Sequence, residues 1–127
     1  MKNLSAAALA LLAGIVIGAA GVEGLHAQAK SPVYLIADNT VIDREGYAKE
    51  YLPLAQPIIK AHGGRYVAAG KGIAIDGEPP NGRVVILQWS SLEQLKSWRY
   101  SPEYVKARAI GEKYAKFRDF AVEGVPQ

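Results

Sequence analysis

The stretch VYLIADNTVI, residues 33–42, decides the fold class because it is apolar on both of its alternating faces. One face carries Val33, Leu35, Ala37 and Val41, and the other carries Tyr34, Ile36, Thr40 and Ile42. Side chains alternate across a β-strand, and β-branched and aromatic residues favour this conformation. The pattern therefore predicts a strand that is covered on both sides.

A helical segment follows this strand. In REGYAKEYLPLAQPIIKAH, residues 44–62, apolar residues recur at helical spacing. Asp43 occupies the N-cap position, where its side chain can accept hydrogen bonds from the amides of the first turn. Pro53 and Pro57 lack an amide donor, so we expect them to kink the helix or divide it into two short pieces. The glycine pair at 63–64 supplies the left-handed conformation that ends a helix.

Two more strands are predicted further along the chain. RYVAAGKGIAIDG, residues 65–77, is the second strand, with an irregularity at Gly70 and Gly72 that we interpret as a β-bulge. EPPNG, residues 78–82, is a turn. RVVILQWSS, residues 83–91, is the third strand, and it is again apolar on both faces.

Two helix starts follow the third strand. Ser91 and Gln94 form a capping box ahead of LEQLKSWRY, residues 92–100. The Ser-Pro-Glu triplet at residues 101–103 then restarts a helix, because it offers an N-cap, a proline at the first helical position and an acid in the first turn. We therefore expect a break between two helical pieces at this triplet.

The last of these helices, residues 103–115, leads to a final strand within residues 116–125. The predicted order is strand, helix, strand, strand, helix, strand. This is the ferredoxin-like βαββαβ arrangement, an α+β fold with a four-stranded antiparallel sheet and its two helices on one face. Because the first and third strands are apolar on both faces, we expect two protomers to pack sheet against sheet as a homodimer.

The first 29 residues differ from the rest of the chain. Lys2 precedes an apolar run at residues 4–22, and Ala27-Gln28-Ala29 fits the small-x-small pattern of a cleavage site. We predict a signal peptide at residues 1–29, a domain at residues 30–127, and a periplasmic or secreted location. The alternative is an uncleaved membrane anchor, because the apolar run approaches the roughly 20 residues that span a bilayer.

Composition excludes several classes of function. The chain has no cysteine, which excludes disulfides, a lipoprotein anchor and thiol catalysis. Its net charge of +3 comes from scattered basic and acidic residues, so we predict no nucleic-acid binding. The Gly-Lys pair at residues 70–71 lacks the spacing and the Ser or Thr of a phosphate-binding loop.

Four stretches resemble one known family. VYLIADNTVIDREGYAKEY, AHGGRYVAAG, RVVILQWSSLEQLKSW and SPEYVKARAIGEKYAKFRDFAVEG are similar to domain-of-unknown-function family 1330, within the dimeric α/β-barrel superfamily. The resemblance covers the whole predicted domain and implies the ferredoxin-like fold and the dimer. It implies little about activity, because the family has none assigned. Members of the superfamily include cofactor-independent monooxygenases, lactone isomerases and haem enzymes, which use the cavity between sheet and helices. The usual family member is cytoplasmic, so an export signal is a departure.

His62 is the one histidine after residue 29, which excludes a multi-histidine metal site within one protomer. At the end of a helix it can interact with the negative end of the helix dipole, or it can bind a ligand. As a general base it would need an orienting partner and a cleft. Axial haem ligation has no second supporting feature, and we predict no cofactor and no metal.

Arg108 falls on one helical stripe with Tyr104 and Gly111, beside apolar and aromatic positions. An arginine in such surroundings needs an anion. The anion can be a carboxylate of this chain, with Asp38, Glu78 or acids of the partner protomer as candidates. It can also be the carboxylate or phosphate of a small ligand.

Tyr66 and Trp98 either wall such a pocket or belong to the ordinary core. The candidate ligand-binding residues are therefore His62, Tyr66, Trp98, Tyr104 and Arg108. We favour a non-catalytic binding or stress-associated module, because His62 alone could titrate near neutral pH. The alternative is a cofactor-independent enzyme, of isomerase or monooxygenase type, acting on an anionic substrate in the sheet–helix cleft. There Arg108 would hold the anionic group, and His62 or Tyr104 would move a proton.

Overall fold

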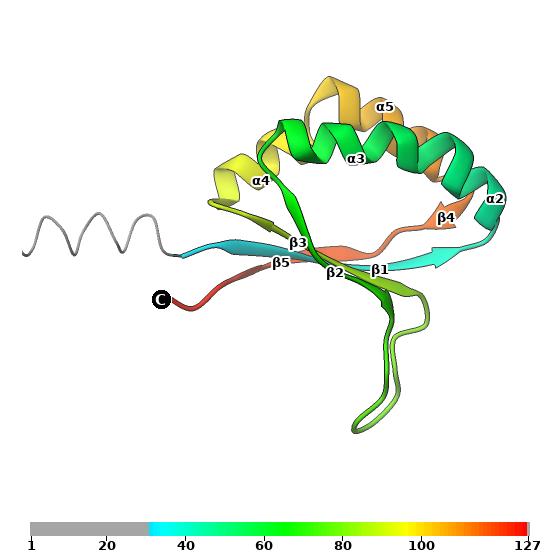
Figure 1. Ribbon diagram of the computed structural model, residues 1–127, viewed down its shortest axis with the longest axis horizontal. Helices are drawn as coiled ribbons and strands as arrows, with labels where there is room; N and C mark the ends of the chain where they lie inside the picture. The colour runs from blue at the N-terminus through cyan, green and yellow to red at the C-terminus, as the bar shows by residue number, and fades with distance from the viewer. Residues whose placement is uncertain (1–30, 127) are drawn as a thin grey trace, which may run out of the picture.

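The computed structural model describes residues 31–126, so the predicted signal segment at residues 1–29 lies outside the described residues. The strands are β1 (Val33–Val41), β2 (Arg65–Lys71), β3 (Arg83–Trp89), β4 (Ala115–Lys116) and β5 (Asp119–Glu123). The helical elements are α2 (Arg44–Gly46), the π-helical turn η1 (Tyr47–Tyr51), α3 (Leu52–Ala61), α4 (Leu92–Arg99) and α5 (Pro102–Gly111). Figure 1 shows the helices on one side of the sheet and the β2–β3 loop projecting on the other.

The sheet confirms the predicted α+β, ferredoxin-like fold. Its strands are antiparallel in the order β2-β3-β1-β4, with β5 also paired to β1. The pairs Thr40↔Lys116 and Ala37↔Asp119 share one register, so β4 and β5 are two parts of the single final strand that the sequence predicts. The sheet therefore has five strands rather than four, because the final strand is interrupted beside Phe117, whose ring packs against Tyr51 at 5.3 Å.

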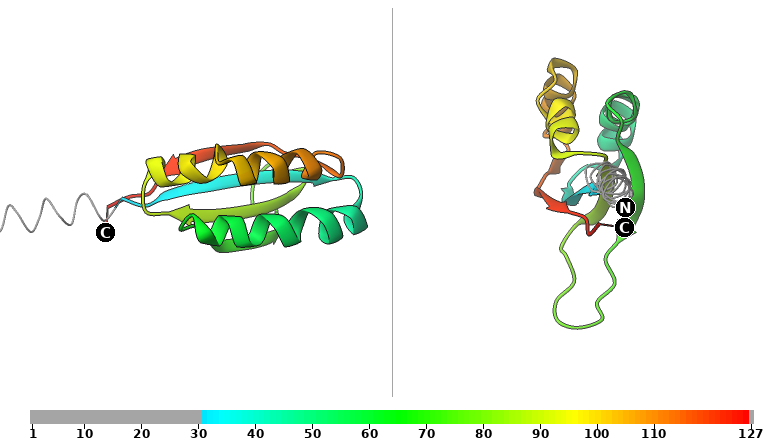
Figure 2. Two further views of the ribbon diagram at one scale, coloured as in Figure 1. Left: turned by 90° about the horizontal axis from the view of Figure 1, so that it is seen from above. Right: turned by 90° about the vertical axis from the view of Figure 1, so that its left-hand side faces the viewer.

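One helical run connects β1 to β2, as Figure 2 shows from above. Asp43 caps it as predicted, by accepting the Gly46 N–H at 3.0 Å. Neither proline breaks the run. Instead the backbone widens to the π-helical turn before Pro53, where the Leu52 N–H bonds to the Tyr47 carbonyl five residues back. Pro53 then lies in the first turn of α3, and Pro57 lies inside it.

The predicted glycine stop after this run is confirmed. Gly63 has φ of +85°, the left-handed conformation that other residues avoid. Gly64 serves a different purpose, because a Cβ there would lie 2.5 Å from the Trp89 ring. The close approach of this backbone to Trp89 connects the helix end to the sheet.

The predicted second strand differs from the observed one in length and irregularity. β2 ends at Lys71, and residues 72–82 form an exposed loop. The register shift lies between Tyr66 and Ala68, so the extra residue is Val67 and the bulge predicted at Gly70 and Gly72 is wrong. Gly70 pairs regularly with Val84, whereas Gly72 begins the loop beside Pro80.

Both predicted caps before α4 and α5 are present. The Ser91 hydroxyl accepts the Gln94 N–H at 3.1 Å, and the Ser101 hydroxyl accepts the Tyr104 N–H at 3.2 Å. The final helix is shorter than predicted, because it ends at Gly111 and residues 112–114 form a turn into β4. A side chain at position 111 would collide with Tyr51, so the glycine permits α5 to lie close to η1.

The two faces of the sheet differ because the helices cover only one of them. Figure 2 shows the two helical runs side by side in one layer on one face. Beneath them lies the core, which includes Val33, Leu35, Ala37, Val85, Leu87 and Trp89 from the sheet. The opposite face carries Tyr34, Ile36, Val84, Ile86, Ala68, Phe120 and Val122, and no element of residues 31–126 covers it.

Within the described residues, no helix has the length and apolar character that crossing a bilayer requires.

Candidate functional site

A cavity of about 70 Å³ lies between the sheet and the helices. The row of register partners Asp119, Ala37, Val85 and Ala69 crosses four strands beneath it. Ala37 and Ala69 are small, so the aromatic side chains of the helices do not meet the sheet at this point. The other polar or aromatic groups of the lining come from Asn39, Tyr47, Tyr51, Gln56, Tyr66, Arg83, Trp98, Tyr104 and Phe117.

Three buried tyrosines form the helix side of the cavity. The hydroxyls of Tyr51 and Tyr104 are 2.7 Å apart and share a hydrogen bond, and the rings of Tyr47 and Tyr51 are 5.0 Å apart. Burial raises the pKa of all three phenols above the ordinary value. They are therefore neutral at physiological pH. A shared bond between two hydroxyls uses only one of their protons, so this pair retains an O–H that can donate into the cavity.

Asn39 and Trp98 bring unsatisfied polar atoms to the same space. Asn39 is 5% exposed, and its Nδ2 donates to the Tyr47 hydroxyl at 3.4 Å. Its Oδ1 finds no hydrogen-bond partner among residues 31–126, and neither does Nε1 of Trp98, a residue that is 1% exposed. Buried polar atoms are nearly always paired in folded proteins. Both residues belong to the cavity lining, and both atoms are buried without a hydrogen bond.

Arg108 lies behind the cavity rather than in its lining. Its side chain is 11% exposed, with Nη1 3.4 Å from Asp119, Nε 3.5 Å from Glu112 and the guanidinium 4.1 Å from the centre of the Phe117 ring. Burial alone would lower the pKa of Arg108, but Tyr104 and Asp119 outweigh it, so this pKa is raised and the group stays charged. The carboxylates that pair with Arg108 are therefore those of Asp119 and Glu112.

The predicted partners of Arg108 are elsewhere. Asp38 accepts the Gly82 N–H at 2.8 Å and lies 3.8 Å from Arg118, and Glu78 belongs to the exposed loop. The prediction was wrong because Asp119 reaches Arg108 only when β5 lies beneath α5, a contact that the spacing within α5 does not indicate. This ion pair also reduces the capacity of Arg108 to bind a ligand anion.

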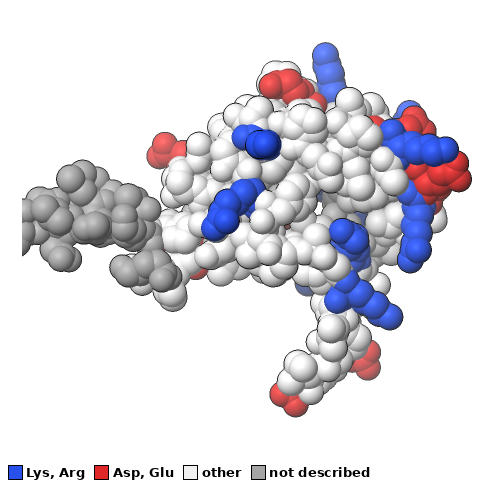
Figure 3. All heavy atoms as spheres, viewed as in Figure 1, with Lys and Arg blue, Asp and Glu red and all other residues white. Residues whose placement is uncertain are grey.

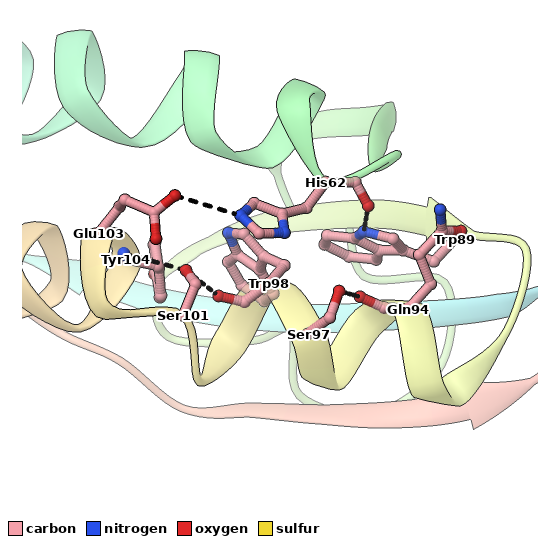
Figure 4. A network of polar contacts seen from close by, with 8 residues as sticks. All are labelled: His62, Trp89, Gln94, Ser97, Trp98, Ser101, Glu103 and Tyr104. Carbon is pink, nitrogen blue, oxygen red and sulfur yellow. Dashed lines mark hydrogen bonds and ion pairs between the residues drawn. The ribbon is translucent and has the colours of Figure 1, made fainter.

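His62 lies outside the cavity lining, at the end of α3. Figure 4 shows its ring beside Trp98 and directed toward Glu103, with Nε2 3.6 Å from the carboxylate. Its carbonyl accepts the Trp89 Nε1–H at 3.1 Å. The pKa of Glu103 is lowered, first by its own backbone amide at the start of α5 and then by His62. Through these contacts His62 lies where the end of α3 meets α4 and the start of α5.

The five predicted residues therefore separate into two groups. Tyr66, Trp98 and Tyr104 line the cavity, whereas His62 and Arg108 do not. Sequence reasoning missed Asn39, Tyr47 and Tyr51. A signal for Asn39 was present, because it continues the inward-facing row of Val33, Leu35 and Ala37 with a polar side chain. Tyr47 and Tyr51 lie in the segment at residues 44–62, whose apolar residues recur at helical spacing. That pattern does not distinguish side chains that pack in the core from side chains that line a cavity.

Residues 31–126 hold no group of three or more His, Cys, Asp or Glu side chains that could bind a metal ion. The cavity lining combines phenol, indole and carboxamide groups with the charged side chains of Arg83 and Asp119 and with apolar side chains. Such groups recognise a ligand by shape and hydrogen bonds rather than by metal coordination.

Comparison with solved structures identifies proteins of similar fold. The chain is similar to the RPA0582 protein of unknown function from Rhodopseudomonas palustris, with 17% identity, a TM-score of 0.61, and coverage of 84% of this chain and 94% of that one. It is similar to SnoaB, described as a cofactor-independent oxygenase from Streptomyces nogalater, with 11% identity, a TM-score of 0.57, and coverage of 76% and 96%. It is also similar to a dimeric ferredoxin-like protein of unknown function from Thermobifida fusca, with 15% identity, a TM-score of 0.50, and coverage of 74% and 90%.

At these identities the similarities concern the fold alone. No functionally curated protein matches the chain. The family model of DUF1330, a domain of unknown function, matches residues 32–125. This range contains every strand and helix of the structure. The chain therefore belongs to the DUF1330 family, as its sequence motifs predict.

Proposed function

We propose that the protein is a homodimer that binds a small molecule between the sheet and the helices of each protomer. The uncovered face of the sheet supports the dimer. Phe120 is 50% exposed and Val122 is 45% exposed, and their register partners Ile36 and Tyr34 continue the apolar surface across β1. A contiguous apolar face of this kind usually marks an interface.

The β2–β3 loop supports the same assembly. It projects on the side of the uncovered face (Figures 1 and 2), and its Ile73 and Ile75 are 84% and 87% exposed. A second copy packed sheet against sheet would offer an apolar surface to these two side chains. The Thermobifida fusca protein of similar fold is described as dimeric. Sedimentation of the full-chain protein at micromolar concentration should give a dimer, and a monomer at that concentration would refute the assembly.

The cavity carries the binding proposal. Leaving a buried polar atom without a hydrogen bond costs about 1–3 kcal/mol, and two residues of the lining carry such an atom, Asn39 Oδ1 and Trp98 Nε1. A ligand group that reaches either atom would supply the missing hydrogen bond, while Leu35, Val85 and Leu87 contact its apolar part. The enclosed volume of about 70 Å³ is below the roughly 150 Å³ that holds a benzene ring, so a ligand with one ring or a short branched chain has to extend beyond the cavity.

The chemistry of the lining supports binding without catalysis. The three phenols stay protonated because burial raises their pKa values, and the carboxylate of Asp119 lies 3.4 Å from Arg108. His62, the one histidine among residues 31–126, is outside the lining. The groups that remain can donate and accept hydrogen bonds, but they offer no strong base at neutral pH.

Native mass spectrometry of protein purified from cells that express the full chain tests the binding proposal. We expect a stoichiometric small molecule on the wild type. It should disappear in Ala69→Phe, which places a ring in the cavity lining, and persist in the matched Ala109→Phe on the exposed side of α5. A wild type without ligand, or a ligand that persists in Ala69→Phe, would contradict the proposal.

The same preparation tests the enzymatic alternative. SnoaB, a protein of similar fold, is described as an oxygenase, and at 11% identity that similarity supports a test only. The recovered molecule should be released with unchanged mass after incubation in air. Conversion to an oxygenated or isomerised product would replace the binding function with an enzymatic one.

We also propose export, as residues 1–29 indicate. The mass of the purified protein should correspond to a chain that begins at Lys30, and the protein should partition with the periplasmic or secreted fraction. A full-length mass in the membrane fraction would instead favour the anchor.

A further inference from the structure

A second hollow adjoins the cavity at the end of β1. It is a groove of about 670 Å³ at the base of the β2–β3 loop. Asn39, Tyr47, Leu52 and Arg83 line both the groove and the cavity. The two hollows are therefore adjacent and share these side chains as their common wall.

The groove is lined by cations. Arg44, Lys71 and Arg83 contribute to its lining, and no carboxylate among residues 31–126 does so. None of the three forms an ion pair within the described residues, in contrast to Lys49, Arg108 and Arg118. Figure 3 shows Lys and Arg side chains gathered where the loop leaves the sheet, while acidic side chains lie at the loop tip and toward the far end of the helical layer.

Strand register explains why the cations face this side of the sheet. Arg83 is the partner of Asn39 in β1 and of Lys71 in β2, so the three side chains form one row on the helix-covered face. Two like charges directly opposite each other on neighbouring strands are destabilising. The charge of Arg83 also reaches the cavity, where it acts to lower the pKa of Tyr47 against the larger effect of burial. An anion between Arg83 and Lys71 would remove this repulsion.

We propose that the groove binds the carboxylate of a small aromatic or branched aliphatic acid whose apolar part extends toward the cavity. This inference rests on the proposed binding function and specifies its ligand class. The planar guanidinium of Arg83 can hold a carboxylate with two parallel hydrogen bonds, and Lys71 adds a second charge. The anion site predicted at Arg108 is thereby assigned to Arg83 and Lys71, which have no internal carboxylate partner in the described residues.

Two isosteric probes test the assignment. Benzoate and benzamide share ring and shape, but only benzoate is charged. Titration of the full-chain protein, followed by calorimetry or amide NMR shifts at low salt, should show benzoate binding roughly tenfold or more tightly than benzamide. The preference should decrease as salt is added, because both the groove and its cations are open to solvent.

A pair of charge-matched variants locates the site. Arg83→Gln/Lys71→Gln should reduce the preference for benzoate to about twofold or less, because the row then offers no charge. Lys106→Gln/Lys113→Gln removes the same net charge from the exposed side of α5 and its following turn, and it should keep the preference. Thermal melting of both variants verifies that they are folded.

The outcomes separate the two proposals. If both probes bind equally and Ala69→Phe abolishes both, the cavity binds ligands but the carboxylate assignment fails. If benzoate binds through Arg83 and Lys71 but its affinity is unchanged in Ala69→Phe, the groove is an anion site and the cavity proposal fails. If neither probe binds at millimolar concentration, or if the Lys106/Lys113 variant loses the preference as strongly, the assignment is overturned.

Discussion

The two faces of the sheet are both apolar, but they differ in how their side chains are held. On the covered face, Trp89 and Trp98 stack with centroids 4.8 Å apart, and Trp98 lies 4.3 Å from the ring of Tyr104. On the uncovered face, Ile36 and Phe120 are neighbours in register but contact no second layer within residues 31–126. Apolar composition alone thus does not distinguish a core from an interface, and mutations should separate the two faces by what they disrupt.

The largest effect is expected on the covered face, from Trp98→Ala. The side chain is 1% exposed and packs between Trp89 and Tyr104, so its removal leaves a cavity and should lower the free energy of unfolding by about 3–5 kcal/mol. Urea denaturation measures the change. Trp98→Phe, which keeps a ring, should lose distinctly less, and a loss under about 1 kcal/mol in Trp98→Ala would contradict this packing.

Ile36→Glu should break the uncovered face instead. It places a charge at the centre of the proposed interface, which should weaken dimerisation by about 3 kcal/mol or more while leaving the folded protomer intact. Sedimentation should show a shift toward monomer with unchanged far-ultraviolet circular dichroism. Ile42→Glu is the matched control, because Ile42 is 66% exposed and lies beyond the end of β1. Equal dimerisation in both variants would remove this face as the interface.

Alkaline pH should act on the covered face through its buried tyrosines. Burial is the main cause of the raised pKa values of Tyr47, Tyr51 and Tyr104. In the unfolded chain these phenols titrate near pH 10, so the unfolded state loses protons first. Stability is thus unaffected below about pH 10 and falls above it, by up to roughly 1.4 kcal/mol per pH unit for each phenol.

Urea unfolding between pH 8 and about pH 11.5 measures this dependence. Tyr51→Phe should reduce its steepness, because one buried phenol no longer titrates. Tyr100→Phe, at a side chain that is 70% exposed, should leave the steepness unchanged. A flat profile in the wild type would mean that these phenols are not buried in solution.

The smallest contrast compares two glycines in different surroundings. In Gly64→Ala, the new methyl group would lie 2.5 Å from Cζ2 of Trp89, whose indole is hydrogen-bonded to His62, so we expect a loss of about 1–3 kcal/mol. In Gly70→Ala, nothing lies within 4 Å of the new Cβ, and stability should change by about 0.5 kcal/mol or less. Thermal melts of the two variants test the difference, and similar losses would contradict it.

The fold was predictable where local signals agreed. The apolar alternation of residues 33–42, the caps at Asp43, Ser91 and Ser101 and the glycine stop at residues 63–64 all act within a few residues, and the structure bears them out. The bulge at Val67 and the early end of α5 were not predicted. Both depend on neighbours distant in sequence, since β2 must match β3 and Gly111 must admit Tyr51.

The candidate site was predictable only in part for the same reason. Tyr104 could be selected because it falls on one helical stripe with Arg108, and Trp98 because it is an aromatic residue that could wall a pocket there. The contact of Arg108 with Asp119 and the row of Asn39, Arg83 and Lys71 arise from strand order and register. Neither contact has a signature in the spacing of residues along the chain.

The sequence by itself determined the elements, their order and the presence of two apolar sheet faces, because hydrophobic periodicity and capping are local properties. Only the tertiary structure decided which face the helices cover, which carboxylates neutralise Arg108, and which cations stay without one. Those choices depend on the antiparallel register of β1 with β3 and β5, which brings together side chains that lie about 40 to 90 positions apart.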